Sequence, residues 1–277
     1  MIDFIVAEDK CIECGLCKDD CPVGIIKLTP KASIAKEKEK NCLKCQHCLA
    51  ICPTAAISIL GKKPEDSVSC KAELPSANAI SNHIKTRRSI RKFKPENVDQ
   101  DLIQLVIKIA SHAPTGHNDN AVLFSLIDNI EDMNMLRDSI YGAIEKAVAE
   151  NRLPKKYISL ASFQKVWEKT GMDIIFRNAP HLLIATAPAK NASPKVDSLI
   201  GLTYFEFAAN ANGLGTLWNG MITWVIEEID QSIRDVIGIP RDHSIGYTLL
   251  FGKPAIKYAR GIQSEGLHVN RISLAKN

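Results

Sequence analysis

From residue 78 onward, hydrophobic positions follow two alternating patterns along the chain. Some segments repeat apolar residues at helical spacing, and others are short continuous apolar runs that suit buried strands. This alternation predicts an α+β domain in which helices flank a central sheet. The expected helices are 78–86, 98–112, 131–150, 162–176, 193–212 and 227–237, and the expected strands are 121–127, 181–187, 215–222 and 244–251.

Two of these helices show a clear apolar stripe. Asp99 is placed to cap the helix 98–112, because a carboxylate can accept hydrogen bonds from the first free N–H groups. Residues three and four positions apart share one face of a helix and are expected to be buried. The stripes comprise Leu102, Ile103, Leu105, Val106 and Ile109 in this helix and Met135, Ile140, Ile144 and Val148 in the helix 131–150.

The first sixty residues contain an internal repeat in which 11–28 matches 42–59. Each half ends in a short apolar run, 24–28 or 55–59, that we expect to form a strand. The charged stretch 31–40 joins the halves and is predicted to be a solvated loop, or alternatively a docking face for a redox partner. A domain of this size has little core, so bound metal is expected to supply much of its folding energy.

Composition sets the boundaries and excludes some functions. Residues 61–77 are rich in Pro, Gly and Ser and are predicted to link a domain at 1–60 to one at 78–277. No run of eighteen apolar residues exists, so we expect no membrane span. The net charge of +4 is spread along the chain, which argues against nucleic acid as a partner. The N-terminus has no basic segment followed by a long apolar one, so we expect a cytoplasmic protein.

The repeat carries two cysteine runs that both read C-x2-C-x2-C-x3-C-P. This is the spacing by which thiolates hold [4Fe–4S] clusters, and in two-cluster proteins the fourth cysteine ligates the other cluster. A proline, Pro22 or Pro53, follows each fourth cysteine. The predicted ligands are Cys11, Cys14, Cys17 and Cys52 for one cluster and Cys42, Cys45, Cys48 and Cys21 for the other.

Zinc and disulfides are the alternatives for these cysteines. Structural zinc usually takes two pairs of ligands separated by a longer loop, which fits two four-cysteine runs poorly. Disulfides would need an oxidising compartment. Cys70 lies outside the repeat and is interpreted as an incidental thiol of the linker. With all eight cysteines and both prolines in place, residues 1–60 resemble the bacterial two-cluster ferredoxins.

Four further segments carry possible binding chemistry. In 87–93, an extended backbone would point Arg87, Ser89 and Arg91 to one side, where two guanidinium groups and a hydroxyl suit a phosphate monoester. The segment 113–118 follows a strong helix and offers Thr115 and Asn118 as hydrogen-bonding groups. Three glycines in 213–220 allow backbone to approach a flat ligand closely, and 252–260 is basic. Taken singly, each could be an ordinary turn, loop, core strand or charged tail.

In this order and spacing, the four segments resemble the nitroreductase family of FMN proteins over roughly 80–260. The resemblance implies an α/β/α sandwich with a central mixed sheet. It also implies an intertwined homodimer in which the loop 113–118 meets the flavin from the partner subunit. The residues it assigns to the cofactor are Arg87, Arg88, Ser89 and Arg91 at the phosphate, Thr115, Gly116 and Asn118 at the flavin, Asn219 and Gly220 at the reactive edge of the ring through backbone N–H groups, and Lys257 and Arg260 completing the phosphate site.

The chemistry implied is that of an FMN-dependent oxidoreductase fed by its own clusters. Each cluster passes one electron at a time and FMN takes two, so two clusters hold the complement of one flavin. The acceptor is expected to be a small electron-poor molecule, such as a nitroaromatic, quinone or enone, and the donor a ferredoxin-type protein or NAD(P)H. No fixed catalytic acid or base is expected, so His112 and His117 are interpreted as structural or ring-adjacent.

Two other functions remain open from the sequence. The protein could be a redox relay or sensor that passes electrons to a protein partner without any organic substrate. It could also be a zinc-binding interaction domain joined to an inactive flavin fold, which visible absorbance from iron–sulfur clusters and flavin would exclude.

Overall fold

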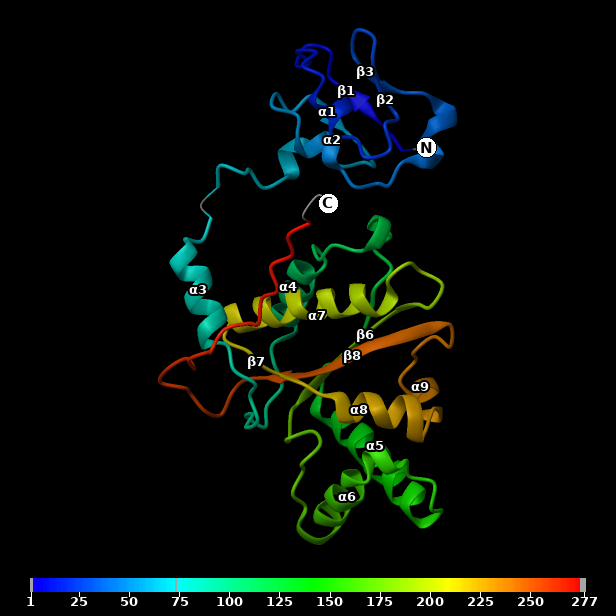
Figure 1. Ribbon diagram of the computed structural model, residues 1–277, viewed down its shortest axis with the longest axis vertical. Coiled ribbons are helices and arrows are strands. Elements are labelled where there is room, and N and C mark those ends of the chain that lie inside the picture. Colours follow the sequence, from blue (N-terminus) through cyan, green and yellow to red (C-terminus); the bar gives the residue numbers. More distant parts are fainter. Residues whose placement is uncertain (1, 73, 275–277) are drawn as a thin grey trace. The chain divides into compact units, whose positions relative to one another are not determined.

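The computed structural model describes residues 2–72 and 74–274, and the chain divides into two compact units. The first unit comprises 1–74 together with the loop Pro114–Ala121, and the second comprises 75–113 and 122–277. The loop comes from the middle of the chain, where the sequence predicted only the larger domain. Figure 1 shows both units, with labels on most of their helices and strands.

The first unit contains two small antiparallel sheets, in which β1 pairs with β4 and β2 with β3. The predicted strand segments 24–28 and 55–59 contain β2 and β4. The prediction of a solvated loop at 31–40 is wrong in part, because β3 lies there and a 3-10 turn follows at Lys36–Asn41. Ala32 is buried opposite Leu28, which gives the charged segment an apolar anchor. The elements are β1 Ile5–Val6, α1 Leu16–Asp19, β2 Ile26–Leu28, β3 Ala32–Ile34, α2 His47–Ala50 and β4 Ile57–Ser58.

The internal repeat is visible in the backbone as well as in the sequence. Three pairs of matching positions have positive φ: Glu13 and Lys44, Gly15 and Gln46, and Gly24 and Ala55. Gly15 and Gln46 each precede the short helix of their half, α1 or α2. The two halves therefore turn in the same way around their cysteines, although the second half does so without glycine at these positions.

The second unit is built on a four-stranded antiparallel sheet of order β5-β6-β8-β7. Its strands are β5 Leu123–Ile127, β6 His181–Pro188, β7 Gly215–Trp218 and β8 His243–Gly252. A parallel bridge between Ser89 and Thr216 adds the predicted phosphate-binding segment to the edge of the sheet at β7. Gly215 is required there, because a Cβ atom would lie 2.4 Å from Cγ1 of Ile90.

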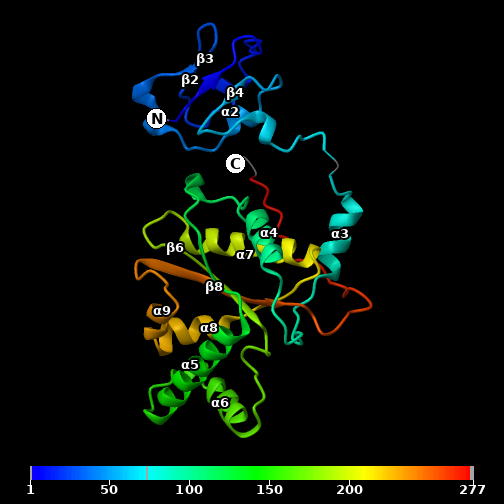
Figure 2. The ribbon, with the colours of Figure 1, turned by 180° about the vertical axis from the view of Figure 1, so that it is seen from behind.

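Helices cover both faces of this sheet, as Figures 1 and 2 show for the second unit. Alternate residues of β6 point to opposite sides, so Leu183 packs with α4 and α7, whereas Leu182 packs with α5 and α6. The prediction of a sheet between two layers of helices is confirmed. The helices of this unit are α3 Ala77–Thr86, α4 Gln100–Ala110, α5 Ile130–Ala149, α6 Ser159–Thr170, α7 Pro194–Ala211, α8 Gly220–Trp224 and α9 Ser232–Val236.

Three predicted elements end differently in the structure. The helix expected over 162–176 stops at Thr170, because Gly171 adopts a left-handed conformation with φ of 68°. The strand expected over 215–222 stops at Trp218, because Asn219 caps α8. The helix expected over 227–237 is replaced by a π-helical turn, Val225–Ile229, and the short helix α9. None of the helices in the described part of the chain combines the length and the apolar composition needed to cross a membrane.

The buried stripes of α4 and α5 are also narrower than predicted. Asp99 caps α4 as expected, and its carboxylate accepts a hydrogen bond from the N–H of Leu102. However, Leu105 and Ile109 are 47% and 42% exposed, and Met135 of α5 is 61% exposed. Apolar side chains on these helices thus lie on two faces. Periodicity alone does not identify which of the two faces packs against the sheet.

A single buried carboxylate holds the irregular segment between α6 and β6. The Asp173 side chain accepts hydrogen bonds from Arg137 Nε at 2.8 Å, from the N–H of Phe176 at 2.8 Å and from the N–H of Asn178 at 2.9 Å. The hydroxyl of Tyr141 completes the set at 3.1 Å, and burial raises the pKa of this tyrosine. Asp173 therefore replaces the regular hydrogen bonding that this segment lacks.

Replacing Asp173 with Asn tests this arrangement. The variant leaves the buried Arg137 guanidinium without its counter-ion, so we expect the free energy of unfolding to fall by about 3 kcal/mol. The matched control is Asp235→Asn, which removes an equally close partner from Arg241 at the surface and should change stability little. Urea unfolding of both variants provides the measurement, and equal losses would contradict the assigned role.

Candidate functional site

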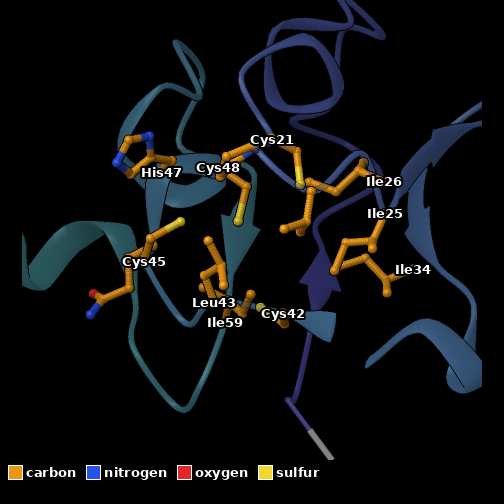
Figure 3. Close-up of a pocket in the computed structure, with 13 residues that line it drawn as sticks. Cys21, Ile25, Ile26, Ile34, Cys42, Leu43, Cys45, His47, Cys48 and Ile59 are labelled. Atoms are coloured by element: carbon orange, nitrogen blue, oxygen red, sulfur yellow. The ribbon is translucent and has the colours of Figure 1, made fainter. Parts of the chain in front are cut away.

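The first unit contains two separate cavities, each lined by four cysteines. One cavity is lined by Cys21, Cys42, Cys45 and Cys48, with Leu43 and several isoleucines beside them. Figure 3 shows the labelled cysteine side chains around this space, which we call the Cys42 cavity. Three of its cysteines come from the second half of the repeat and the fourth from the first half.

We call the other cavity the Cys11 cavity. Its lining includes Cys11, Cys14 and Cys17 of the first half and Cys52 of the second. The two groups of four cysteines are the two predicted ligand sets, so the fold brings together the residues that the spacing assigned to each cluster. Their roles as ligands remain a prediction.

Each quartet surrounds a space rather than a point. Among residues 2–72 and 74–274, no three His, Cys, Asp or Glu side chains are arranged to hold a single metal ion. A [4Fe–4S] cluster takes one thiolate at each of four separate iron atoms, so its ligands must stand apart from one another. The cavities and their cysteines therefore fit two iron–sulfur clusters.

The surroundings of the thiols differ within each quartet. Burial raises the pKa of Cys48 to about 11, and it also raises the pKa of Cys17. Burial acts in the same direction on Cys52, but hydrogen bonds from the N–H of Ala56 at 3.2 Å and from Thr54 outweigh it and lower the pKa. Iron–sulfur clusters are held by thiolates, so binding of clusters by these residues would release protons from the buried thiols.

Polar contacts hold the cysteine loops in place. The N–H of Lys44 donates to Sγ of Cys42 at 3.4 Å, and Lys31 Nζ donates to the carbonyl oxygen of Cys11 at 2.8 Å. His47 and Asp20, 3.1 Å apart, connect α2 to α1. N–H groups directed at cysteine sulfur are among the features that set the potential of a cluster.

In the second unit, the predicted phosphate-binding residues lie beside a buried acid. Arg87 donates to Glu206 Oε1 on α7 at 3.2 Å, and the Thr216 hydroxyl donates to the same oxygen at 2.8 Å. Part of the hydrogen-bonding capacity of Arg87 is therefore used to hold the segment to α7 and β7. Sequence reasoning missed Glu206, although an acidic residue within the largely apolar segment 193–212 was a usable signal.

Arg88 differs from Arg87 in having an unused buried donor. Its Nη2 donates to the carbonyl oxygen of Lys85, whereas its Nε is buried and has no hydrogen-bond partner within the described residues. A buried donor without a partner is costly, and an anion such as phosphate would satisfy it. This observation fits the predicted phosphate group of FMN.

The basic tail lies next to the arginine segment, as the resemblance implied. Phe93 pairs with Pro254, and the N–H of Ala255 donates to the carbonyl oxygen of Lys92 at 2.9 Å. A Cβ atom on Gly261 would lie 2.5 Å from the carbonyl oxygen of Lys85. The fold thus brings together the backbone segments of four further predicted phosphate residues, Ser89, Arg91, Lys257 and Arg260.

The Asn219 N–H, which is predicted to lie near the flavin ring, already has a hydrogen-bond partner in the chain. This N–H donates to the carbonyl oxygen of Thr248 at 3.0 Å, and the Asn219 side chain caps α8 and donates to the carbonyl oxygen of Ile175 at 2.6 Å. Gly220 is the first residue of α8, where the N–H has no acceptor within the helix. Of this pair, Gly220 keeps the geometry that suits a ligand.

The predicted flavin loop belongs to the first unit. Asn118 Nδ2 donates to the carbonyl oxygen of Leu43 at 3.0 Å, and the Thr115 hydroxyl accepts from the N–H of Asn120 at 3.0 Å. Gly116 begins a 3-10 turn that ends at Asn118. His117 and His112 are exposed, and neither contributes a described contact to the cysteine cavities.

Comparison with known families identifies both parts of the chain. Residues 84–253, more than half of the chain, match the nitroreductase family, and residues 10–56 match the 4Fe-4S dicluster domain. The chain therefore belongs to the nitroreductase family and carries a ferredoxin-like dicluster domain at its N-terminus. The resemblance inferred from the sequence is confirmed in both parts, and so is the fold class.

Solved structures show the same fold at low sequence identity. A nitroreductase with bound FMN from Bacteroides fragilis is 18% identical with a TM-score of 0.58, and the match covers 70% of this chain and all of that one. An FMN-bound nitroreductase from Desulfitobacterium hafniense is 20% identical with a TM-score of 0.52, and the match covers 68% of this chain and 96% of that one. A putative NADH dehydrogenase/NAD(P)H nitroreductase from Bacteroides thetaiotaomicron is 20% identical with a TM-score of 0.51, and the match covers 71% of this chain and all of that one. A search of the curated proteins gave no match.

Replacing Cys21 with Ala tests the exchange of ligands between the two halves. We expect loss of the cluster in the Cys42 cavity, although Cys21 is closer in sequence to Cys11, Cys14 and Cys17. Electron paramagnetic resonance of the reduced protein and iron analysis provide the measurement. Cys70→Ala is the control, because Cys70 is exposed and lines neither cavity. Loss of the other cluster instead would contradict the assignment.

Proposed function

We propose that this protein is an iron–sulfur flavoprotein oxidoreductase that passes electrons from two [4Fe–4S] clusters to FMN and then to a small electron-poor acceptor. The observation that carries the proposal is the presence in one chain of a nitroreductase domain and of a dicluster domain whose eight cysteines form two separate quartets. Each cluster supplies one electron and the flavin takes two, so the two clusters of one chain hold the electrons that one flavin needs.

Three features support FMN as the flavin. The similar structures from B. fragilis and D. hafniense contain FMN. Arg88 has a buried Nε without a partner in the described part of the chain, and basic segments 87–91 and 252–260 lie together. We assign the phosphate to Arg87, Arg88, Ser89 and Arg91, with Lys257 and Arg260 beside them. We assign the reactive edge of the ring to Asn219 and Gly220, and a second side of the ring to Thr115, Gly116 and Asn118 of the partner subunit.

We also propose a homodimer, in which the exposed apolar residues of two packed helices would be covered. Leu105 and Ile109 of α4 and Leu199 and Tyr204 of α7 are each more than a third exposed. Apolar side chains at this density on adjacent helices are typical of a surface that meets another chain. The acceptor is a nitroaromatic, quinone or enone, and the electron donor is a ferredoxin-type protein or NAD(P)H.

Anaerobic reconstitution with iron, sulfide and FMN tests the function. We expect about eight iron atoms and one FMN per chain, from two four-iron clusters and one flavin. Stepwise reduction should then bleach the cluster absorbance and the flavin absorbance, and a nitroaromatic or quinone should reoxidise the protein with turnover. A protein that exchanges electrons with neither type of compound would be a relay, and one that never binds FMN would overturn the proposal.

Replacing Arg88 with Gln tests the phosphate site. A hydrogen bond to a charged group is worth about 1.5–3 kcal/mol, so we expect FMN to dissociate about tenfold to a hundredfold more readily. The matched control is Lys92→Gln, which removes the same charge from an exposed position in the same segment. Fluorescence titration with FMN and with riboflavin provides the measurement. An equal loss of riboflavin binding would contradict a role at the phosphate.

A further inference from the structure

The loop Pro114–Ala121 makes a specific contact with the dicluster domain. Asn118 Nδ2 donates a hydrogen bond of 3.0 Å to the carbonyl oxygen of Leu43, which lies between Cys42 and Cys45 in the chain. Leu43 also lines the Cys42 cavity. The backbone of Leu43 and one hydrogen bond therefore connect a predicted ligand, Cys42, with the loop that we assign to the flavin ring.

Hydrogen bonds within the loop accompany a defined backbone conformation. His117, Asn118 and Asn120 have φ of 54°, 55° and 49°, in the left-handed region that Asn and His adopt more readily than most residues. The N–H of Asn120 donates to the Thr115 hydroxyl, and Asn120 Nδ2 donates to the carbonyl oxygen of Asn118, both at 3.0 Å. In this conformation the Asn118 amide reaches the carbonyl oxygen of Leu43.

The internal repeat provides a comparison within the same molecule. Ile12 occupies the position in the first half that Leu43 occupies in the second, and each residue lines the cavity of its own half. Ile12 is 63% exposed, whereas Leu43 is partly buried. The ligand loops of the two cavities are thus equivalent in sequence spacing and backbone turn, but the hydrogen bond of the loop goes to the second one.

We propose that Asn118 fastens the loop Pro114–Ala121 to the ligand loop of the Cys42 cavity, and that electrons leave the dicluster domain from this cavity rather than from the Cys11 cavity. The inference rests on the proposed function, because it names the route between cofactors that the function requires. Asn118 is a positioning residue for this transfer.

The electron count of the route is balanced. Each transfer oxidises one iron–sulfur cluster by one electron and adds that electron to the flavin. Two transfers complete the reduction of the flavin, which takes its protons from water. A low-potential one-electron reductant, dithionite in the test below, returns the electrons to the clusters.

Replacing Asn118 with Asp tests the proposal with little change of shape. Aspartate keeps the size of the side chain and tolerates the left-handed conformation, but it places a carboxylate oxygen against the carbonyl oxygen of Leu43. Asn151→Asp is the matched control, because it makes the same chemical change outside the loop, at an exposed asparagine with a similar φ of 53°. Both variants are studied as full-length protein loaded with iron, sulfide and FMN.

Two measurements are made on each protein. Hydrogen–deuterium exchange reports the protection of amides in 42–45 and 114–121, and stopped-flow absorbance after mixing with dithionite reports the transfer from clusters to flavin. For Asn118→Asp we expect exchange to become about fivefold faster and transfer to slow by a similar factor, as for the loss of one hydrogen bond. For Asn151→Asp both quantities should stay within about twofold of the wild type.

The outcomes separate this proposal from the proposed function. If Asn118→Asp matches Asn151→Asp in both measurements, the contact is unimportant and the proposal is overturned. Faster exchange with unchanged transfer also overturns it, because electrons would then leave by another route. If the wild type passes no electrons from clusters to flavin, the proposed function fails and the exit route with it, while exchange at 42–45 still shows whether the loop is docked.

Discussion

Each cysteine quartet is completed by a residue from the other half of the repeat, and the architecture of the dicluster domain depends on this exchange. Cys21 reaches the cavity of the second half and Cys52 reaches that of the first. The domain has two very short sheets and a small apolar core, so its halves have little else to hold them together. Metal bound in both cavities would cross-link the halves twice.

The sequence predicted most of what is regular in the larger unit. The alternation of apolar runs and amphipathic segments identified every strand of the central sheet, because each strand is a short apolar run with clear boundaries. The prediction failed where a single residue determines how an element begins, ends or folds. Gly171 ends α6, Asn219 turns a strand into the start of α8, and Asp173 organises a segment that has no periodicity to read.

The candidate site shows the same division between local and distant information. Cysteine spacing is local, so it predicted which residues share a cavity. The partners of Arg87, Asn118 and Asn219 are Glu206, Leu43 and Thr248, which lie far away in the sequence. Only the folded chain shows that the donor of Asn118 and the N–H of Asn219 are already in use.

The hydrogen bonds of the Asp173 carboxylate have an effect beyond the segment between α6 and β6 that they stabilise. Ile175 lies within this segment, and its carbonyl oxygen accepts the hydrogen bond from Asn219 Nδ2 across 44 residues of sequence. Asn219 in turn fixes the first turn of α8, where the free N–H of Gly220 is located. A stretch of coil that has no regular structure of its own therefore helps to determine where α8 begins and where its first N–H groups lie.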